Sequence, residues 1–160
     1  MRKFRVVTLA LALVVLVTAA TALAAKPKKV AFTGSYSGQA TTQLNGNTAT
    51  IAATGNGTGT MLGSSTLTGQ GTGDTSVQPC VPWGGTGMLA GKGSSLAFKV
   101  VSTAKGCGDD GGHLFSVSGY VSVTKATGKL AKAKGTLRFT GVYSRDDGSF
   151  SVKFTGTLTQ

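Results

Sequence analysis

After residue 25, apolar and polar side chains alternate with a period of two over several separate stretches of the chain. Between His113 and Lys125, for example, Phe115, Val117 and Val121 share one parity, and serine and threonine take most of the other positions. Successive side chains of a β-strand point to opposite faces, so this period predicts strands with one apolar face each. The stretches that show it are 30–37, 48–54, 60–70, 96–100, 113–125, 137–143 and 150–158. We expect seven or eight antiparallel strands.

Glycine recurs inside these predicted strands, at Gly34, Gly119, Gly141 and Gly156. A glycine within a strand forfeits side-chain packing and loses more chain entropy on folding than other residues do. Tight coiling of a sheet into a closed barrel is a physical reason for such positions. The predicted fold is therefore an all-β antiparallel barrel, with a β-sandwich as the alternative.

The last two predicted strands also permit a prediction of their register. The dipeptide Asp147-Gly148 is typical of a two-residue type I′ turn. Each inward glycine of the hairpin would then lie opposite a phenylalanine, which covers the bare backbone. Pairing around this turn sets the following residues opposite one another: Tyr143 and Val152, Gly141 and Phe154, Phe139 and Gly156.

The composition agrees with strands and turns. Of the 160 residues, 25 are glycine, 24 threonine and 14 serine, only 13% are charged, and glutamate is absent. Helical domains draw much of their surface from Glu, Lys, Arg and Gln, because these side chains lose little freedom in a helix. The composition therefore excludes a helical bundle, a Rossmann-type enzyme and a coiled coil.

Residues 1–25 have the pattern of a signal peptide. Three basic residues within the first five positions precede the apolar run Val6–Val17, and small residues then lead to an A-x-A pattern that ends at Ala24. We expect cleavage near Ala24 or Ala25, which leaves residues 26–160 as a single secreted barrel domain. The alternative is a retained membrane anchor, because no charge interrupts Val6–Ala25.

The predicted mature domain is basic and contains two cysteines. Without the leader, 13 Lys and Arg stand against 5 Asp, a net charge of +8. This excess favours an anionic polymer or membrane surface as partner, and export argues against nucleic acid. Solubility is the alternative reason for the charge. An even number of cysteines in an oxidising compartment predicts a disulfide between Cys80 and Cys107.

Two short patterns repeat along the chain. Phe-Thr-Gly occurs at 32–34, 139–141 and 154–156, and the stretch 86–98 is echoed 41 positions later at 127–139. We interpret the longer echo as two similar units, each with a glycine turn, a docking leucine and then a strand.

The pattern Thr-Gly-x-Leu-Ala-x-x-x-Gly-Thr-Leu at 127–137 resembles the glycine-turn-strand signature of the allene oxide cyclase and dirigent barrels. It is also similar to that of small secreted bacterial proteins rich in Thr and Gly. The resemblance implies an eight-stranded antiparallel barrel that is often oligomeric. It carries over no catalytic residue, because the cyclase pocket includes a glutamate and this chain has none.

Reactive side chains concentrate in the loop Cys107–His113, which contains Asp109 and Asp110. These groups could ligate a metal, but adjacent side chains diverge and calcium requires more oxygen ligands. Glycine and aspartate also favour a loop on backbone grounds alone. The chain has no nucleophile-elbow motif and no phosphate-binding loop. We therefore predict no catalytic residue, no metal site and no cofactor.

A basic stripe is the first candidate for ligand binding. Lys132, Lys134 and Arg138 alternate on the outer face of one predicted strand, and Lys153 lies outward on its hairpin partner. Such a stripe suits an anionic cell-envelope polymer or a lipid surface. The alternative is that lysines on an exposed sheet edge prevent one sheet from pairing with another.

Trp83 and His113 are the other candidates for ligand binding. Trp83, the single tryptophan, lies in the predicted rigid loop 79–84, where it could stack on a sugar or an apolar ligand or cap the open end of the core. His113 shares the inward parity of Phe115 and would line the barrel mouth without a partner.

The function that we predict is that of an exported, non-catalytic barrel, a binding or structural module at or outside the cell envelope, with homo-oligomerisation as an option. The alternative is an enzyme with a pocket at the barrel mouth, either similar to allene oxide cyclase or acting on another small ligand.

Overall fold

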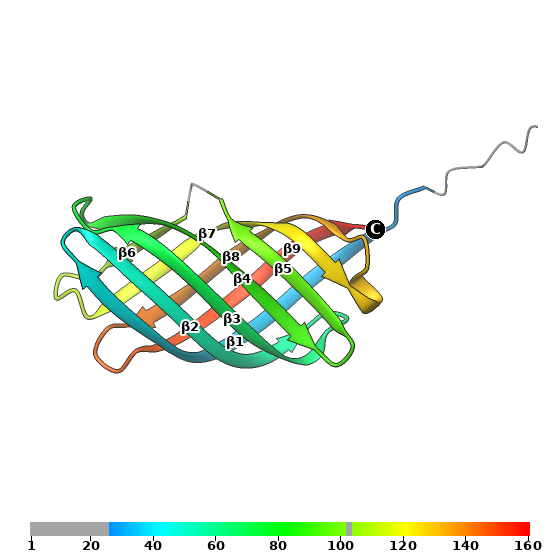
Figure 1. Cartoon of the computed structure of the whole chain (residues 1–160), viewed down its shortest axis with the longest axis horizontal. Helices are drawn as coiled ribbons and strands as arrows, with labels where there is room; N and C mark the ends of the chain where they lie inside the picture. Colours follow the sequence, from blue (N-terminus) through cyan, green and yellow to red (C-terminus); the bar gives the residue numbers. More distant parts are fainter. Residues whose placement is uncertain (1–25, 102–103) are drawn as a thin grey trace, which may run out of the picture.

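The structure, a computed structural model, describes residues 26–101 and 104–160, so the predicted signal peptide lies outside the described residues. Strands dominate the described chain, with one short 3-10 turn, η1, at Gly128–Leu130 (Figure 1). Within these residues, no helix is long and apolar enough to cross a membrane. The strands are β1 Lys29–Asn45, β2 Thr48–Gly59, β3 Gly63–Asp74, β4 Cys80–Gly91, β5 Ser94–Val100, β6 Lys105–Gly108, β7 Leu114–Thr127, β8 Lys134–Ser144 and β9 Ser149–Thr159.

The strands close into an antiparallel barrel. Neighbours pair in the order β3-β2-β1-β9-β8-β7-β5-β4, and β3 also pairs with β4, which completes a ring of eight. The short strand β6 continues the position of β5, since both lie between β4 and β7, β5 at one end of the barrel and β6 at the other. The predicted barrel is confirmed, and the alternative β-sandwich is wrong because the ring of pairings closes.

Strand β4 corrects two predictions. Trp83 lies within this strand and not in a loop. Gly87 is also inside β4, whereas Gly128, its counterpart in the 41-residue echo, begins η1 with a φ of +61°. The two units therefore share only their leucines, Leu89 and Leu130, both without exposed surface, and the strand that follows. Glycine obscured the alternation in β4, because it contributes no apolar side chain to the pattern.

Strands β8 and β9 pair in a register two residues away from the predicted one. The turn between them has four residues, 145–148, of which only Gly148 has a positive φ, whereas a type I′ turn requires two. The carboxylate of Asp147 accepts the Ser149 N–H at 2.9 Å instead. A shift of two preserves the inside–outside order of the strands. The observed pairs include Phe139 with Phe154 and Gly141 with Val152.

Phenylalanines still cover strand glycines, but across other strand pairs. Phe154 on β9 faces Gly34 on β1, and Phe139 on β8 faces Gly119 on β7. A Cβ atom at Gly119 would lie 2.7 Å from Ala104 and 2.9 Å from the Phe139 ring. Ala104 and the ring together occupy the space that a side chain would need, which favours curling of the sheet at this position.

The two ends of the barrel differ in how they are filled. The closed end is the one where β1 begins and β9 finishes, and there η1 places Leu130 against the core. The connections β1–β2, β3–β4, β6–β7 and β8–β9 gather at the other end, which we call the mouth (Figure 1). The leucines that fill the closed end have no exposed surface: Leu89, Leu96, Leu130, Leu137 and Leu158.

Candidate ligand cavity

An apolar cavity of about 330 Å³ occupies the part of the barrel nearest the mouth. Phe98, Phe139 and Phe154 form its floor, with ring centroids of Phe98 and Phe154 at 5.7 Å and of Phe139 and Phe154 at 6.2 Å. Trp83 packs edge-to-face on Phe139, with the centroids 5.6 Å apart. The predicted ligand-binding tryptophan therefore lies in the cavity wall.

The cavity exists because opposite walls carry side chains of different size. An eight-stranded barrel is just wide enough for ordinary side chains to fill. Aromatic residues project inward from β7, β8 and β9, but β1, β2 and β3 contribute many small residues and leave space unfilled. A Cβ atom at Gly69, for example, would find no atom closer than 3.6 Å. The small residues are Ala40, Ala49, Ala53, Gly69, Gly71 and Gly73.

Polar groups concentrate at the outer edge of the cavity. The hydroxyl groups of Tyr143 and Thr42 are 2.9 Å apart and join β8 to β1, the two strands on either side of β9. Gln78 and Arg145 also line this edge, and Arg145 is the one charged residue among the lining residues. A bound molecule would thus meet apolar groups at depth and hydrogen-bond donors near solvent.

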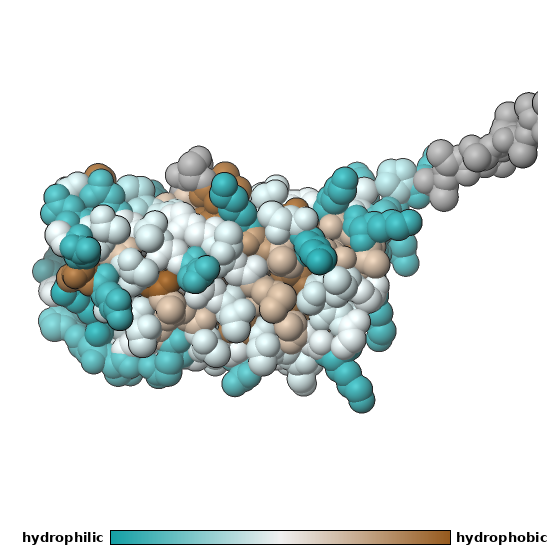
Figure 2. Space-filling view, in the orientation of Figure 1, coloured by the Kyte–Doolittle hydropathy of each residue, from teal (hydrophilic) through white to brown (hydrophobic). Residues whose placement is uncertain are grey.

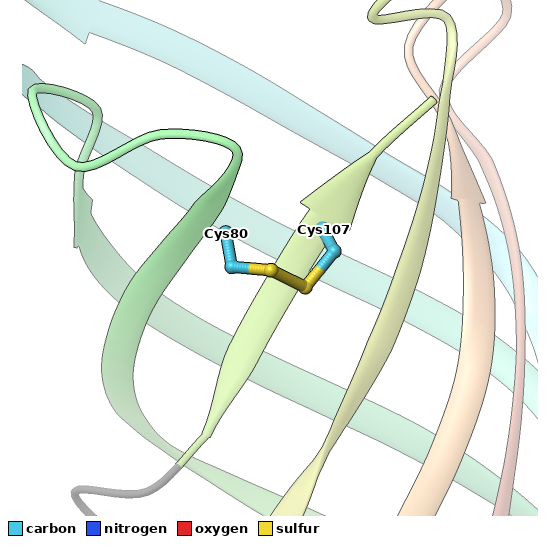
Figure 3. The surroundings of a disulfide bond; sticks show 2 residues. All are labelled: Cys80 and Cys107. Carbon is cyan, nitrogen blue, oxygen red and sulfur yellow. A yellow bond between two sulfur atoms is a disulfide. The ribbon is translucent and has the colours of Figure 1, made fainter. Parts of the chain in front are cut away.

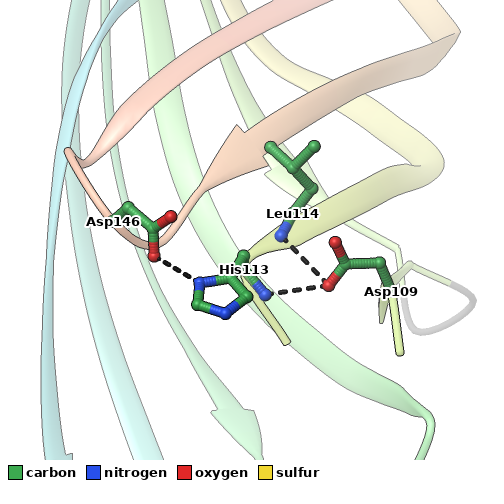
Figure 4. Close-up of polar contacts among 4 residues, drawn as sticks. All are labelled: Asp109, His113, Leu114 and Asp146. Atoms are coloured by element: carbon green, nitrogen blue, oxygen red, sulfur yellow. Dashed lines mark hydrogen bonds and ion pairs between the residues drawn. The ribbon is translucent and has the colours of Figure 1, made fainter. Parts of the chain in front are cut away.

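His113 lies on the rim and not in the cavity lining (Figure 4). Its side chain is 64% exposed, with Nδ1 2.7 Å from Oδ1 of Asp146. The hydrogen bond that His113 donates to the Asp146 carboxylate, reinforced by the charge of Asp146, raises the pKa of His113 above the ordinary value of 6.5. The prediction that His113 points inward without a partner is wrong, because β7 begins only at Leu114.

The aspartates beside His113 stabilise the turns of the rim. Oδ1 of Asp109 accepts the N–H groups of His113 at 2.8 Å and Leu114 at 3.3 Å (Figure 4). The first of these bonds is the main reason why the pKa of Asp109 is lowered. The pKa of Asp147 falls to about 2, chiefly because its carboxylate accepts the Ser149 N–H. These carboxylates are engaged with the backbone of their own loops.

Cys80 on β4 and Cys107 on β6 lie directly opposite each other and form the predicted disulfide (Figure 3). The next residues along each strand, Val81 and Gly106, pair with one another and line the cavity. The disulfide therefore fixes the short strand β6 in the wall of the mouth.

The residues of the predicted basic stripe lie on the outside of the barrel. Lys134 and Arg138 are exposed on β8, and Lys153 is exposed on β9. Lys132 is not on that strand but in the connection before it, with a φ of +66°. Protection of a sheet edge does not explain the stripe, because β8 pairs with both β7 and β9.

The main prediction from the sequence did not include this cavity, because a pocket at the barrel mouth belonged only to the alternative, an enzyme. Its signal was present in the run of inward alanines and glycines along β2 and β3, opposite strands rich in aromatic residues. Small residues in a strand are also compatible with close packing, so only the arrangement of the walls distinguishes the two cases.

Comparisons with protein-family models, with curated proteins and with solved structures find no match for this chain. The eight-stranded antiparallel barrel implied by the resemblance to allene oxide cyclase and dirigent barrels is present. Kinship with those families, and the oligomer that it implies, stay predictions.

Proposed function

We propose that this protein binds a small apolar molecule inside its barrel and acts as a non-catalytic carrier or receptor. The observation that supports this function best is the apolar cavity of about 330 Å³ near the mouth. Its volume lies at the lower end of the range of ~300–1,000 Å³ typical of small-molecule sites. Hollow eight-stranded barrels are suited to a single small ligand.

The lining indicates the chemistry of the ligand. Side chains around an empty space lack dispersion contacts on one side. Flat or branched apolar groups of a ligand would supply these contacts to the aromatic rings of the lining. The polar groups at the outer edge, Gln78, Tyr143 and Arg145, favour a ligand whose polar end faces solvent. We therefore expect a compact apolar molecule with at most one polar end.

The lining also favours binding over catalysis. General acid–base catalysis needs a titrating group within hydrogen-bond reach of the reacting atoms. Among the lining residues, the ionisable side chains are Tyr143 and Arg145, and the lining contains no carboxylate and no imidazole. An enzyme at this mouth would have to recruit a base such as His113, which is already bonded to Asp146.

Action outside the cytoplasm is part of the proposal. The disulfide supports it, because such bonds persist in oxidising compartments. The signal-peptide pattern of residues 1–25 supports it independently.

A fluorescence titration tests the proposed function. Trp83 is the single tryptophan and lines the cavity, so it reports on the site directly. We would add N-phenylnaphthylamine, a neutral apolar dye, and follow energy transfer from Trp83. Saturable binding of one dye per barrel is expected, and a linear, non-saturating response would refute the proposal.

A matched pair of substitutions locates the binding site. Ala53 points into the cavity, whereas its neighbour Ala52 is exposed on the outer face of β2. Ala53→Phe should fill part of the cavity and weaken dye binding by roughly tenfold or more, because the dye and the ring compete for the same space. Ala52→Phe should leave it unchanged. Equal effects of the two substitutions would place the dye elsewhere.

A further inference from the structure

The charged residues of this barrel are separated between its two ends. All five aspartates of the sequence lie in or next to the connections at the mouth: Asp74, Asp109, Asp110, Asp146 and Asp147. The closed end has none of them. Lys26, also exposed, precedes this end, and from Lys28 onward the end carries six exposed lysines: Lys28, Lys29, Lys92, Lys129, Lys132 and Lys134. The molecule is therefore a cylinder with a cationic end and an end that contains every acidic side chain.

Strand pairing places four of these lysines around the end of β9. Lys29 on β1 and Lys134 on β8 both lie opposite Thr159, one on each side of it. The backbone of Lys28 exchanges two hydrogen bonds with Gln160, at 2.9 and 2.8 Å. The side chain of Gln160 in turn donates to the carbonyl oxygen of Lys129 at 2.8 Å.

The other two lysines extend the same surface. The N–H of Lys129 donates to Oγ of Ser94 at 3.0 Å, which places the β4–β5 turn with Lys92 next to η1. Lys132 lies between η1 and β8. Hydrophilic side chains are visible at this end, where β1 begins, as they are at the mouth (Figure 2).

No acidic side chain of the described residues neutralises this cluster. Within the described residues, the one ion pair is that of His113 with Asp146, at the opposite end. The two ends are about 25 Å apart by the rise and tilt of the ten steps of β8. This exceeds twice the Debye length of ~8–10 Å, so the aspartates of the mouth hardly screen the lysines in a salt solution.

The shape of the surface favours a membrane as the partner. The lysines cover the end of a cylinder, which presents a compact face to a plane, whereas a linear polymer would be expected to follow a groove or stripe along the side. Lysine is a point charge on a flexible stem, suited to mobile headgroups more than to one fixed ligand geometry.

We propose that the closed end of the barrel docks on the surface of an anionic lipid bilayer and that the mouth points away from it. Each lysine near an anionic surface adds attraction that salt weakens. Docking by this end leaves the cavity open to solvent and keeps the acidic rim out of the negative surface potential. This proposal does not depend on the proposed ligand binding.

Vesicle co-sedimentation tests the docking surface. Protein beginning at Lys26 is mixed with vesicles of phosphatidylcholine, with and without phosphatidylglycerol. We expect binding only to the vesicles with phosphatidylglycerol, and loss of that binding as salt is raised. Equal binding to both kinds of vesicle, or binding to neither, would overturn the proposal.

Two variants of equal net charge then localise the contact. The closed-end variant replaces Lys29, Lys92, Lys129 and Lys134 with Gln, and the side-wall variant replaces Lys99, Lys125, Arg138 and Lys153. All eight residues are exposed, so both variants should keep the unfolding midpoint of the parent. We expect the closed-end variant to lose roughly a hundredfold or more in vesicle affinity, and the side-wall variant much less. Equal losses of vesicle affinity in the two variants would mean that net charge, and not the closed end, determines binding.

Two controls address the alternative partner and the orientation. A soluble polyphosphate should bind the protein more weakly than vesicles of the same phosphate concentration do. If polyphosphate bound more tightly, and the side-wall variant lost that binding, the partner would be an anionic polymer and not a membrane. Asp74→Asn with Asp110→Asn should leave vesicle affinity unchanged, because both residues lie beyond screening range. Stronger binding of that variant would place the mouth at the membrane and overturn the orientation.

Discussion

Glycine plays two different parts in the wall of this barrel. At Gly141, a Cβ atom would overlap the backbone carbonyl of Ser151 on the neighbouring strand. At Gly69, the same atom would enter the cavity, with nothing closer than 3.6 Å. The first glycine is required by close approach of two backbones, whereas the second leaves room that a side chain could take.

A single methyl group distinguishes the two cases. We expect Gly69→Ala to raise the free energy of unfolding by about 0.5–1 kcal/mol, because it restricts the unfolded chain and fits the native space. We expect Gly141→Ala to lower it by about 1–3 kcal/mol, because the strands must move apart. Urea unfolding of both variants measures these values. A loss of stability in Gly69→Ala would mean that the space beside this residue is already filled.

The single histidine offers a second test at this scale. Hydrogen bonding to Asp146 stabilises the charged form of His113, so its pKa in the folded protein should exceed 6.5. The resulting stabilisation is fully present below pH 6.5 and is lost as the pH rises through the raised pKa. An NMR titration of the imidazole should show the elevated pKa, and Asp146→Asn should return it to the ordinary range. An unchanged pKa in that variant would assign the shift to another group.

At the scale of elements, β6 is the shortest strand of the wall. It has four residues, Lys105–Gly108, and pairs with only a short part of β4 and of β7. The disulfide from Cys107 to Cys80 joins it covalently to β4 at the mouth. The stability of β6 should therefore depend on this bond more than on its own backbone pairing.

Removal of the disulfide tests this dependence. We expect Cys80→Ser with Cys107→Ser to lower the free energy of unfolding by about 2–4 kcal/mol, because the unfolded chain gains freedom. Amide hydrogen exchange should also become faster in β6 than in β1 or β9. Uniform acceleration across all strands would show that the bond stabilises the barrel as a whole instead.

At the scale of the whole molecule, closure depends on the two ends of the chain. Strands β1 and β9, the first and the last, pair along most of their length. Backbone hydrogen bonds between Lys28 and Gln160 continue this pairing to the end of the chain. The termini of the described domain therefore lie side by side. We expect the ring of strands to close equally well when the chain begins at another strand.

A circular permutant tests this closure. A short glycine-serine linker would join Gln160 to Lys28, and new termini would open at Lys92–Gly93, an exposed turn between β4 and β5. We expect the same barrel, seen as an unchanged far-UV circular dichroism spectrum and cooperative unfolding, because the linker spans neighbouring ends. A permutant that fails to fold would mean that the β4–β5 connection is needed to form the barrel.

Much of the architecture followed from the sequence alone. The period-two alternation located most strands, because the inside and outside of a barrel wall differ in polarity at every step. Interior glycines such as Gly119 indicated curvature, and Cys80 and Cys107 could pair only with each other within the chain. These are local properties or properties of composition, so no knowledge of the packed chain was needed.

The tertiary structure decided the rest. The register of β8 and β9 depended on a four-residue turn that Asp147 stabilises, and a shift of two leaves the polarity pattern unchanged. The cavity depended on which small residues face which aromatic ones across the barrel, and the two charged ends depended on where the loops gather. The register, the cavity and the charged ends each depend on distances between residues of different strands. The pattern of residues along the sequence does not contain these distances.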